Sequence, residues 1–301
     1  MQNLRTYVLP IAILMGCLFH NYCGQLAFLT PYFIYIILLL AFCAVDVRRL
    51  RPKKLDLWLI LYQVFVSGAL YLILRWCGVN EIISQGILVG VLCPVAASSV
   101  VIACMLGANR STMTAYCIIS NLVTVVAAPI YFSFIGQNQD MPFFESVWII
   151  FQHVFSAVGL PFVTALLLQH FWPKANTFLT RFKSWSFYVW GVLFTITFGQ
   201  TVHFIILHGR ANLTSVIVLT VAALVGAILQ FGLGRIIGRH YGEKIAGQQL
   251  MGQKNSSLGI WMSNLYLEPL AAVYLASYSV IQNIINSLEI WWAGKHGVKE
   301  T

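Results

Sequence analysis

The sequence is poor in charge, and above all in acidic residues. Of its 301 residues only 9% are charged and nine are Asp or Glu, whereas 59% are hydrophobic and 14% aromatic. A soluble domain of this length carries far more charge on its surface. We therefore expect no soluble domain: the composition, with apolar runs of about 20 residues, is typical of an all-α integral membrane protein.

Signatures of enzymes and of metal sites are also missing. The chain has no G-x-S-x-G, H-E-x-x-H or Walker pattern, and its seven cysteines show no C-x-x-C spacing. Ser99 could serve an intramembrane hydrolase only with a base, and none stands at a recognisable spacing. We expect no enzyme, no metal site, no disulfide framework and no cofactor. The N-terminal apolar run lacks an A-x-A-like site, so a cleaved signal peptide is not expected either.

Basic residues are present, but they are spread between the apolar runs. The net charge of +9 is not pooled into one patch, which argues against nucleic-acid binding. Ten apolar segments predict ten membrane-spanning helices, near 6–22, 29–46, 57–75, 82–108, 112–136, 145–171, 185–206, 213–237, 245–267 and 269–293.

The positions of Lys and Arg predict the orientation. Fifteen of the eighteen lie at the two termini and in the connections after segments two, four, six and eight, and only Arg75 and Arg210 fall on the opposite side. By the positive-inside rule both termini are cytoplasmic, in a multi-pass protein of the cell (inner) membrane.

The eighteenth basic residue, Lys254, lies within segment nine, in the stretch QQLMGQKNSSLG over 248–259. An ammonium at mid-membrane costs about 3 kcal/mol on insertion scales unless partners receive it. The alternative is a cytoplasmic loop over 243–257, in which Lys254 is solvated, followed by one long helix over 258–290. That helix would have to cross Glu268-Pro269, a pair that normally ends a helix, and would leave nine spans.

Segments four and nine are both interrupted, and they hold the same place in two halves of five segments. The first break is at Cys93-Pro94 and the second is in GQKNSSLG, which begins at Gly252. Paired broken helices in corresponding positions indicate a secondary transporter built from inverted repeats. We expect two inverted five-helix repeats, at 1–136 and 137–301, because an odd number of spans reverses the second half.

At these residues the chain resembles the bile acid:sodium symporter family. The shared features are RRLRPKKLDLWLILYQVF before and within segment three, the C-P break, G-x-x-N-S-x-L-G in segment nine and SVIQNIINSLEIW in segment ten. The resemblance implies panel and core domains, with helices four and nine crossing at their broken centres beside the sodium and substrate sites. The candidate substrate-binding residues are Ser99, Ala97, Lys254, Asn255 and Asn283.

The sodium ligands of that family are only partly present. Leu250 and Lys254 stand where the family has glutamate and glutamine, and Ala97 and Val100 where it has threonine and asparagine. A sodium ion needs several hard oxygen ligands, and a nearby ammonium repels it. The resemblance therefore implies weak or absent sodium coupling. The remnants of the ion site are Gln63, Ser99, Thr112, Thr114, Gln253 and Lys254.

We interpret Lys254 as a tethered cation about where the family places sodium, with side-chain acceptors expected from Gln63, Ser99, Gln253 and Asn255. A purely structural intramembrane lysine is the competing interpretation. The predicted function is secondary transport of a small organic anion by alternating access, with sodium or a proton as candidate coupling ion. Three alternatives stay open: a sodium-coupled symporter with a rebuilt ion site, an arsenite-type exporter using Cys93, and a membrane receptor without transport activity.

Other polar residues in the apolar segments are weaker signals. His153 and His203 are expected to be hydrogen-bonded membrane histidines rather than proton relays. Asn283, like Asn255, could equally serve helix packing. Glu289 stands near Trp291 and Trp292 and is interpreted as interfacial. Substrate identity and oligomeric state are not predicted.

Overall fold

The computed structural model describes residues 2–45, 52–136 and 141–295, and every named element within them is a helix. The connection 46–51 and the tail 296–301, which carry several of the charges used to predict orientation, lie outside the described residues. The first half contains α1 (Gln2–Leu18), α2 (His20–Cys23), α3 (Thr30–Cys43), α4 (Lys54–Leu61), a π-helical turn (Tyr62–Val66), α5 (Ser67–Trp76), α6 (Glu81–Leu92), α7 (Ser99–Met105) and α8 (Arg110–Ile135).

The second half follows a similar order. It contains α9 (Phe143–Val154), a π-helical turn (Phe155–Gly159), α10 (Leu160–Phe171), α11 (Pro173–Thr180), α12 (Ser186–His208), α13 (Leu213–His240), α14 (Lys244–Gly252), α15 (Ser256–Tyr266) and α16 (Ala272–Lys295). All ten predicted segments contain helix. Each half ends with a long helix, a broken helix and another long helix. In the first half these are α4–α5, the broken pair α6 and α7, and α8. In the second half they are α13, the broken pair α14 and α15, and α16. The inverted relation of the halves and their boundary remain predictions.

Five of the described helices are long and apolar enough to cross a membrane: Lys54–Trp76, Arg110–Ile135, Phe143–Phe171, Ser186–His208 and Leu213–His240. Large apolar side chains are exposed along them, as Ile217, Val221, Leu224 and Ile228 are on α13. Such a surface is stable when lipid is the solvent, because acyl chains cover it. The protein is a multi-pass membrane protein; that all ten segments cross remains a prediction.

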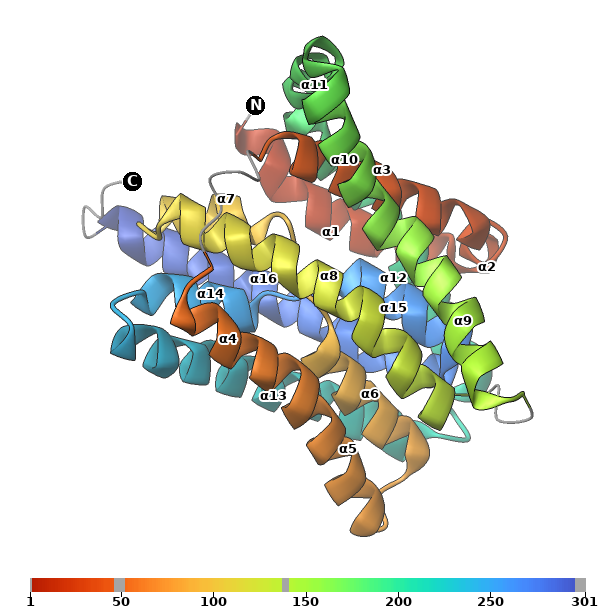
Figure 1. Cartoon of the computed structure of the whole chain (residues 1–301). Helices are drawn as coiled ribbons and strands as arrows, with labels where there is room; N and C mark the ends of the chain where they lie inside the picture. Colours follow the sequence, from red (N-terminus) through yellow and green to blue (C-terminus); the bar gives the residue numbers. More distant parts are fainter. Residues whose placement is uncertain (1, 46–51, 137–140, 296–301) are drawn as a thin grey trace.

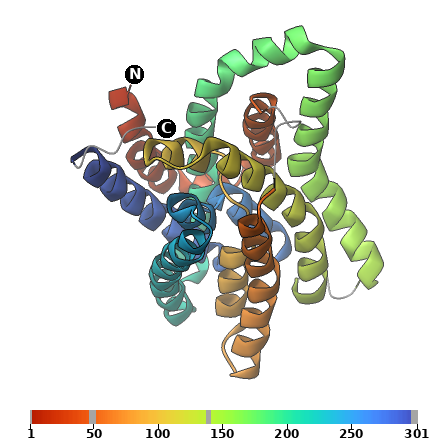
Figure 2. The ribbon, with the colours of Figure 1, turned by 60° about the vertical axis from the view of Figure 1, so that its left-hand side comes forward.

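The helices pack in two groups (Figures 1 and 2). In one group α1 and α2 pack on α12, and α3 packs on α10 and α12. In the other group α13 packs on α14 and α16, and α5 on α6. This grouping is compatible with the panel and core domains that the resemblance implies.

Small residues let the helices of the second group approach closely. The ring of Tyr274 on α16, which is 2% exposed, packs against Gly90 of α6 and Gly226 of α13. A Cβ atom added at Gly90 would lie 1.9 Å from the Tyr274 ring, and one added at Gly226 would lie 2.0 Å from the Tyr274 hydroxyl oxygen. Glycine is therefore required where α6 and α13 face this ring.

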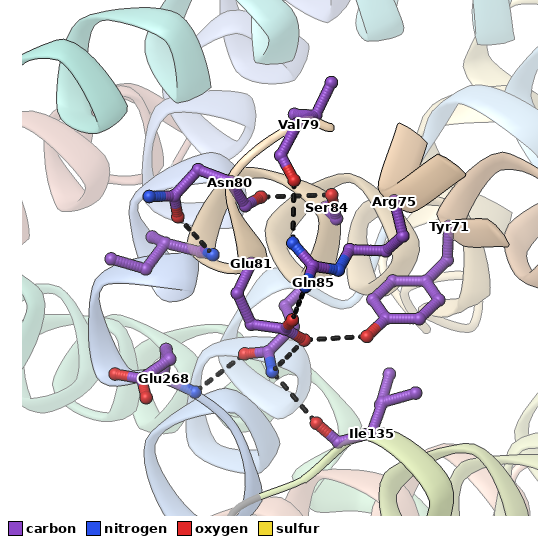
Figure 3. A network of polar contacts seen from close by, with 10 residues as sticks. Tyr71, Arg75, Val79, Asn80, Glu81, Ser84, Gln85, Ile135 and Glu268 are labelled. Carbon is purple, nitrogen blue, oxygen red and sulfur yellow. Dashed lines mark hydrogen bonds and ion pairs between the residues drawn. The ribbon is translucent and has the colours of Figure 1, made fainter. Parts of the chain in front are cut away.

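Near the N-terminal end of α6, the buried carboxamide of Gln85 links this helix to α8 and to the turn after α15 (Figure 3). Gln85 donates to the carbonyl oxygen of Ile135 (3.0 Å) at the end of α8, and accepts from the backbone N–H of Glu268 (2.8 Å). It also donates to Glu81 (3.0 Å), which pairs with Arg75 at 2.9 Å. The hydrogen bond from the Glu268 N–H to Gln85 fixes the turn at 267–269. At this turn α15 has ended, and a new helical turn begins at Pro269. The alternative of one long helix over 258–290 is therefore wrong, because Glu268-Pro269 ends the helix.

Candidate functional site

The two broken helices cross each other at their breaks. Val95, between α6 and α7, and Lys254, between α14 and α15, form an isolated antiparallel bridge. The backbone N–H of Asn255 donates to the carbonyl oxygen of Pro94 at 2.8 Å, and the thiol of Cys93 donates to the carbonyl oxygen of Asn255 at 3.1 Å. Two stretches of unwound chain from opposite halves of the sequence are thus joined at one point.

Local sequence explains where each helix stops. Pro94 has no N–H to continue α6, and Cys93 before it takes the extended conformation that a following proline favours (φ −55°, ψ 132°). In the second break Gly252 is the last helical residue of α14, and Asn255 caps α15 by accepting from the N–H of Leu258 at 3.4 Å.

Three of the carbonyl groups left free at these breaks accept hydrogen bonds from side chains, which helps to satisfy backbone buried in a membrane. At the end of α6, the carbonyl of Val91 accepts from the Lys254 ammonium (3.0 Å), and that of Leu92 accepts from Gln63 (2.9 Å). At the end of α14, the carbonyl of Gly252 accepts from the hydroxyl of Tyr278 (2.7 Å). Side chains from elsewhere in the chain therefore supply hydrogen-bond donors in place of the N–H groups that a continuing helix would have provided.

Each break is also held by the last long helix of its own half. Asn121 of α8 donates to the carbonyl of Val95 (3.3 Å), and the N–H of Val95 donates to the hydroxyl of Ser120 (3.2 Å). Gln282 of α16 accepts from the N–H of Lys254 (2.9 Å) and donates to its carbonyl (3.2 Å). The backbone at the crossing is thus fixed from both sides.

Lys254 is only 4% exposed, so the alternative of a solvated loop is wrong. Its ammonium donates to Val91, and no Asp or Glu of the described chain forms an ion pair with it. The carbonyl end of α6 carries the partial negative charge of the helix dipole, which stabilises a cation there. An ammonium has three N–H donors, and two of them have no protein partner among the described residues. The site is positive and can still donate.

None of the side chains expected to accept from this ammonium does so among the described residues. Gln63 is 2% exposed; its amide donates to Leu92 and Thr124 (both 2.9 Å), and its oxygen accepts from Ser120 at 2.8 Å. Gln253 donates to Gln249 and Asn286. The expectation of side-chain acceptors for Lys254 is therefore wrong: the end of a broken helix already offers a carbonyl without an intrahelical partner.

Several other predicted residues do lie at the crossing. Ala97 is half-buried within the first break, and Asn255 is half-buried in the second. Ser99 is completely buried in the first turn of α7, and its hydroxyl has no hydrogen-bond partner among the described residues. Ser257 has the same property in the first turn of α15. Two buried hydroxyls without partners therefore flank the crossing.

Thr112 and Asn283 make contacts elsewhere. Thr112, which is buried, donates to Glu243 at 3.1 Å, and Glu243 pairs with Lys53. This threonine therefore belongs to a polar cluster roughly two helical turns before Ser120. Thr114 is half-buried on the same helix. Asn283 donates to the carbonyl of Ser279 on its own helix (2.7 Å), and the neighbouring Gln282 makes the contact with Lys254 instead.

A polar seam that the sequence analysis missed runs from the crossing along α14 and α16. Both carboxylate oxygens of Glu289 accept hydrogen bonds, one from Gln248 and the other from Gln249 at 2.7 Å. Gln248 in turn accepts from Arg235 at 3.0 Å. The structure places Glu289 half-buried against α14, and its expected interfacial depth in the membrane remains a prediction. The signal was available in the sequence, because Ser279, Gln282, Asn286 and Glu289 recur at helical spacing on one face of α16.

Comparison with known proteins assigns the chain to a family. The family model of the sodium bile acid symporter family matches residues 28–208, which is more than half of the chain. The matched region includes the first broken helix and ends before the second, which holds Leu250 and Lys254. No curated protein matches the chain. Members of this family are transporters, and this chain belongs to the sodium bile acid symporter family.

Proposed function

We propose that the protein is a secondary transporter of a small organic anion, working by alternating access with weak or no sodium coupling. The observation that carries the proposal is the buried ammonium of Lys254 at the crossing of two broken helices. Unwound segments near mid-membrane are where secondary transporters bind their substrates. A fixed cation with two donors free is suited to a carboxylate, sulfate or sulfonate.

The start of α15 supports an anion in the same place. Helix N-termini carry partial positive charge and N–H groups without intrahelical partners, which favour anions. Here Lys254 precedes that N-terminus by two residues, and the completely buried Ser257 offers a hydroxyl without a described partner. Asn255, Ser99 and Ala97 are the further candidates for substrate contacts, from their positions at the two breaks.

The surroundings of Leu250 support weak sodium coupling. This side chain, 2% exposed, stands where the family has a glutamate, and it belongs to an apolar cluster with Met251, Tyr116 and Leu59. Gln63 and Gln253 persist from the ion site, but their amides are engaged by other residues. A tethered ammonium in place of sodium would make the site positive without a bound ion, and reversible loss of its proton would give a route to proton coupling.

Uptake into proteoliposomes tests the proposal. Native mass spectrometry of the purified protein first identifies copurifying anions, and these are assayed beside labelled bile acids, keto acids and sulfated steroids. We expect uptake that persists when choline replaces sodium. A steep sodium dependence would support the symporter with a rebuilt ion site, and binding without uptake would support a receptor. We further propose cytoplasmic termini and a location in the cell (inner) membrane, from the charge distribution.

A further inference from the structure

The short helix α11 connects the ends of two helices that are long and apolar enough to cross a membrane. It follows α10 after a turn at Trp172 (φ −138°, ψ 64°) and leads into α12 through a 3₁₀ turn at Arg181–Trp185. In Figure 2 this green part of the chain runs across the top of the view, from the upper end of α10 to that of α12. Asn176 fixes it by donating to the carbonyl oxygen of Cys43 at the end of α3 (3.2 Å). A helix in this position lies along the membrane surface rather than through the bilayer.

The two faces of α11 differ in exposure and in charge. The half-buried residues are on the face turned to the protein: Ala175, Asn176, Leu179 and Thr180. The exposed residues are on the opposite face, at the spacing i, i+3, i+4 and i+7: Lys174, Thr177, Phe178 and Arg181. With Pro173 these four line an open hollow of about 440 Å³. Lys174 and Arg181 are roughly 10 Å apart along the helix, so one anionic group between them is within reach of both flexible side chains.

The positive charge of this face is not neutralised by the protein. Residues 171–185 contain no Asp or Glu, and neither Lys174 nor Arg181 forms an ion pair with a carboxylate of the described chain. The positive-inside rule places this connection on the cytoplasmic side, where the membrane surface carries anionic lipids. The charge of the exposed face is therefore complementary to the surface on which α11 is expected to lie.

Aromatic rings show which kind of anion fits this face. Five of them are exposed on α11 and next to its ends: Phe171, Trp172, Phe178, Phe182 and Trp185. A soluble anion would leave these rings in water, whereas a phospholipid brings acyl chains that cover them, and Trp is enriched at this depth. We propose that Lys174 and Arg181 bind the headgroup phosphate of an anionic phospholipid, with Phe178 against its acyl chains. Because α11 packs on α3, the bound lipid anchors the first group of helices to the cytoplasmic leaflet.

Native mass spectrometry of the full chain, delipidated in a neutral detergent, tests the site. The protein is offered equal amounts of phosphatidylglycerol and phosphatidylcholine, and the parent should retain phosphatidylglycerol preferentially. The double variant Lys174→Gln with Arg181→Gln should bind that lipid roughly thirtyfold more weakly, as expected for two basic contacts at a membrane surface. The matched control is Arg239→Gln with Lys244→Gln. It removes the same charge from exposed residues at the end of α13 and the start of α14, on the same predicted side, and should keep the preference.

Inorganic phosphate distinguishes a lipid site from a site for any anion. Added at the same concentration as the lipid, it should not displace phosphatidylglycerol, because it has no acyl chains to cover the aromatic rings. Displacement by phosphate, or an equal loss of lipid in the two double variants, would show a general attraction of anions to basic surface and overturn the proposal. Equal retention in the parent and in Lys174→Gln with Arg181→Gln overturns it as well. The unfolding temperature without lipid checks that each variant is folded, and no readout depends on transport activity.

Discussion

The ammonium of Lys254 donates a 3.0 Å hydrogen bond to the carbonyl oxygen of Val91, which lies 163 residues earlier in the chain. A buried cation in this protein is thus received by the end of a broken helix rather than by a carboxylate. The contact satisfies a carbonyl of α6 that has no intrahelical partner, and it leaves the crossing positively charged. Lys254 can have two roles: to cap α6 by donating to the Val91 carbonyl, and to attract an anion by its charge. The cap needs only a hydrogen-bond donor, so a neutral donor at this position separates the two roles.

Lys254→Gln separates them, because a glutamine can still donate but carries no charge. We expect the protein to fold and the affinity for its anionic substrate to fall at every sodium concentration. Loss of one partner of a buried charged pair commonly costs about 3–5 kcal/mol, which in binding is a hundredfold or more. Binding of the copurifying anion, measured by calorimetry or by the KM of uptake, checks the size of the loss.

The matched control is Lys244→Gln. Lys244 is exposed at the start of α14, so its charge is solvated and its loss should change the affinity little. Unchanged affinity and transport in Lys254→Gln would show that the ammonium only caps α6, which is the structural interpretation.

The double variant Leu250→Glu with Lys254→Gln supplies the two side chains that the family has at these positions. We expect uptake by this variant to gain some sodium dependence, because a carboxylate and an amide oxygen are hard ligands and the repelling ammonium is gone. Ala97 and Val100 still lack oxygen atoms, so the sodium affinity should stay low. Uptake is measured over a sodium series balanced with choline, beside Lys254→Gln alone. Equal sodium curves for the two variants would contradict the prediction.

The seam between α14 and α16 gives a prediction about stability. Glu289→Gln replaces a carboxylate that accepts from both Gln248 and Gln249 with an amide that has only one oxygen. One buried donor then loses its partner, which costs about 1–3 kcal/mol. Thermal unfolding in detergent should show a lower midpoint than in Glu145→Gln, which changes an exposed carboxylate on α9. Equal midpoints would mean that the glutamines find other partners.

The helices and the two helix breaks could be read from sequence because they depend on local signals. Apolar runs marked the helices, and Cys93-Pro94 and Gly252 marked the breaks, since proline and glycine act on their own backbone. The partners at the crossing could not be read in this way. The acceptor for Lys254 is a backbone carbonyl on a distant helix, and every residue type offers the same carbonyl.

The roles of Gln282 and Asn283 show the same limit. Both are amides near the middle of α16, and the family resemblance pointed to Asn283. The rotation of α16 decides which of them faces Lys254, and the structure places Gln282 there. One residue along a helix turns a side chain by about 100°, so adjacent polar residues cannot exchange roles.

Packing around Tyr274 predicts different outcomes at two glycines. Gly90→Ala would push a methyl group into the Tyr274 ring, and overpacking of this kind costs about 1–3 kcal/mol. Gly232→Ala, within α13, meets no atom within 4 Å and should be neutral or stabilising by up to about 1 kcal/mol, because alanine favours helix. Thermal unfolding of the two variants checks the contrast. A tolerated Gly90→Ala would mean that Tyr274 has room to move.

The last prediction concerns orientation, and Cys77 provides the probe. This cysteine is exposed directly after α5, in the connection that the positive-inside rule places outside the cytoplasm. In a variant that keeps only Cys77, with the other six cysteines changed to alanine, a membrane-impermeant maleimide should label intact cells. Lys244→Cys in a cysteine-free background is the control and should be labelled only after permeabilisation, because the start of α14 is predicted to face the cytoplasm. The two sites lie at opposite ends of the predicted helices, so one experiment tests the orientation from both sides. Labelling of Lys244→Cys, but not of Cys77, in intact cells would show that the orientation is the reverse of the predicted one. The end of the polar seam at Glu289 would then face the outer side.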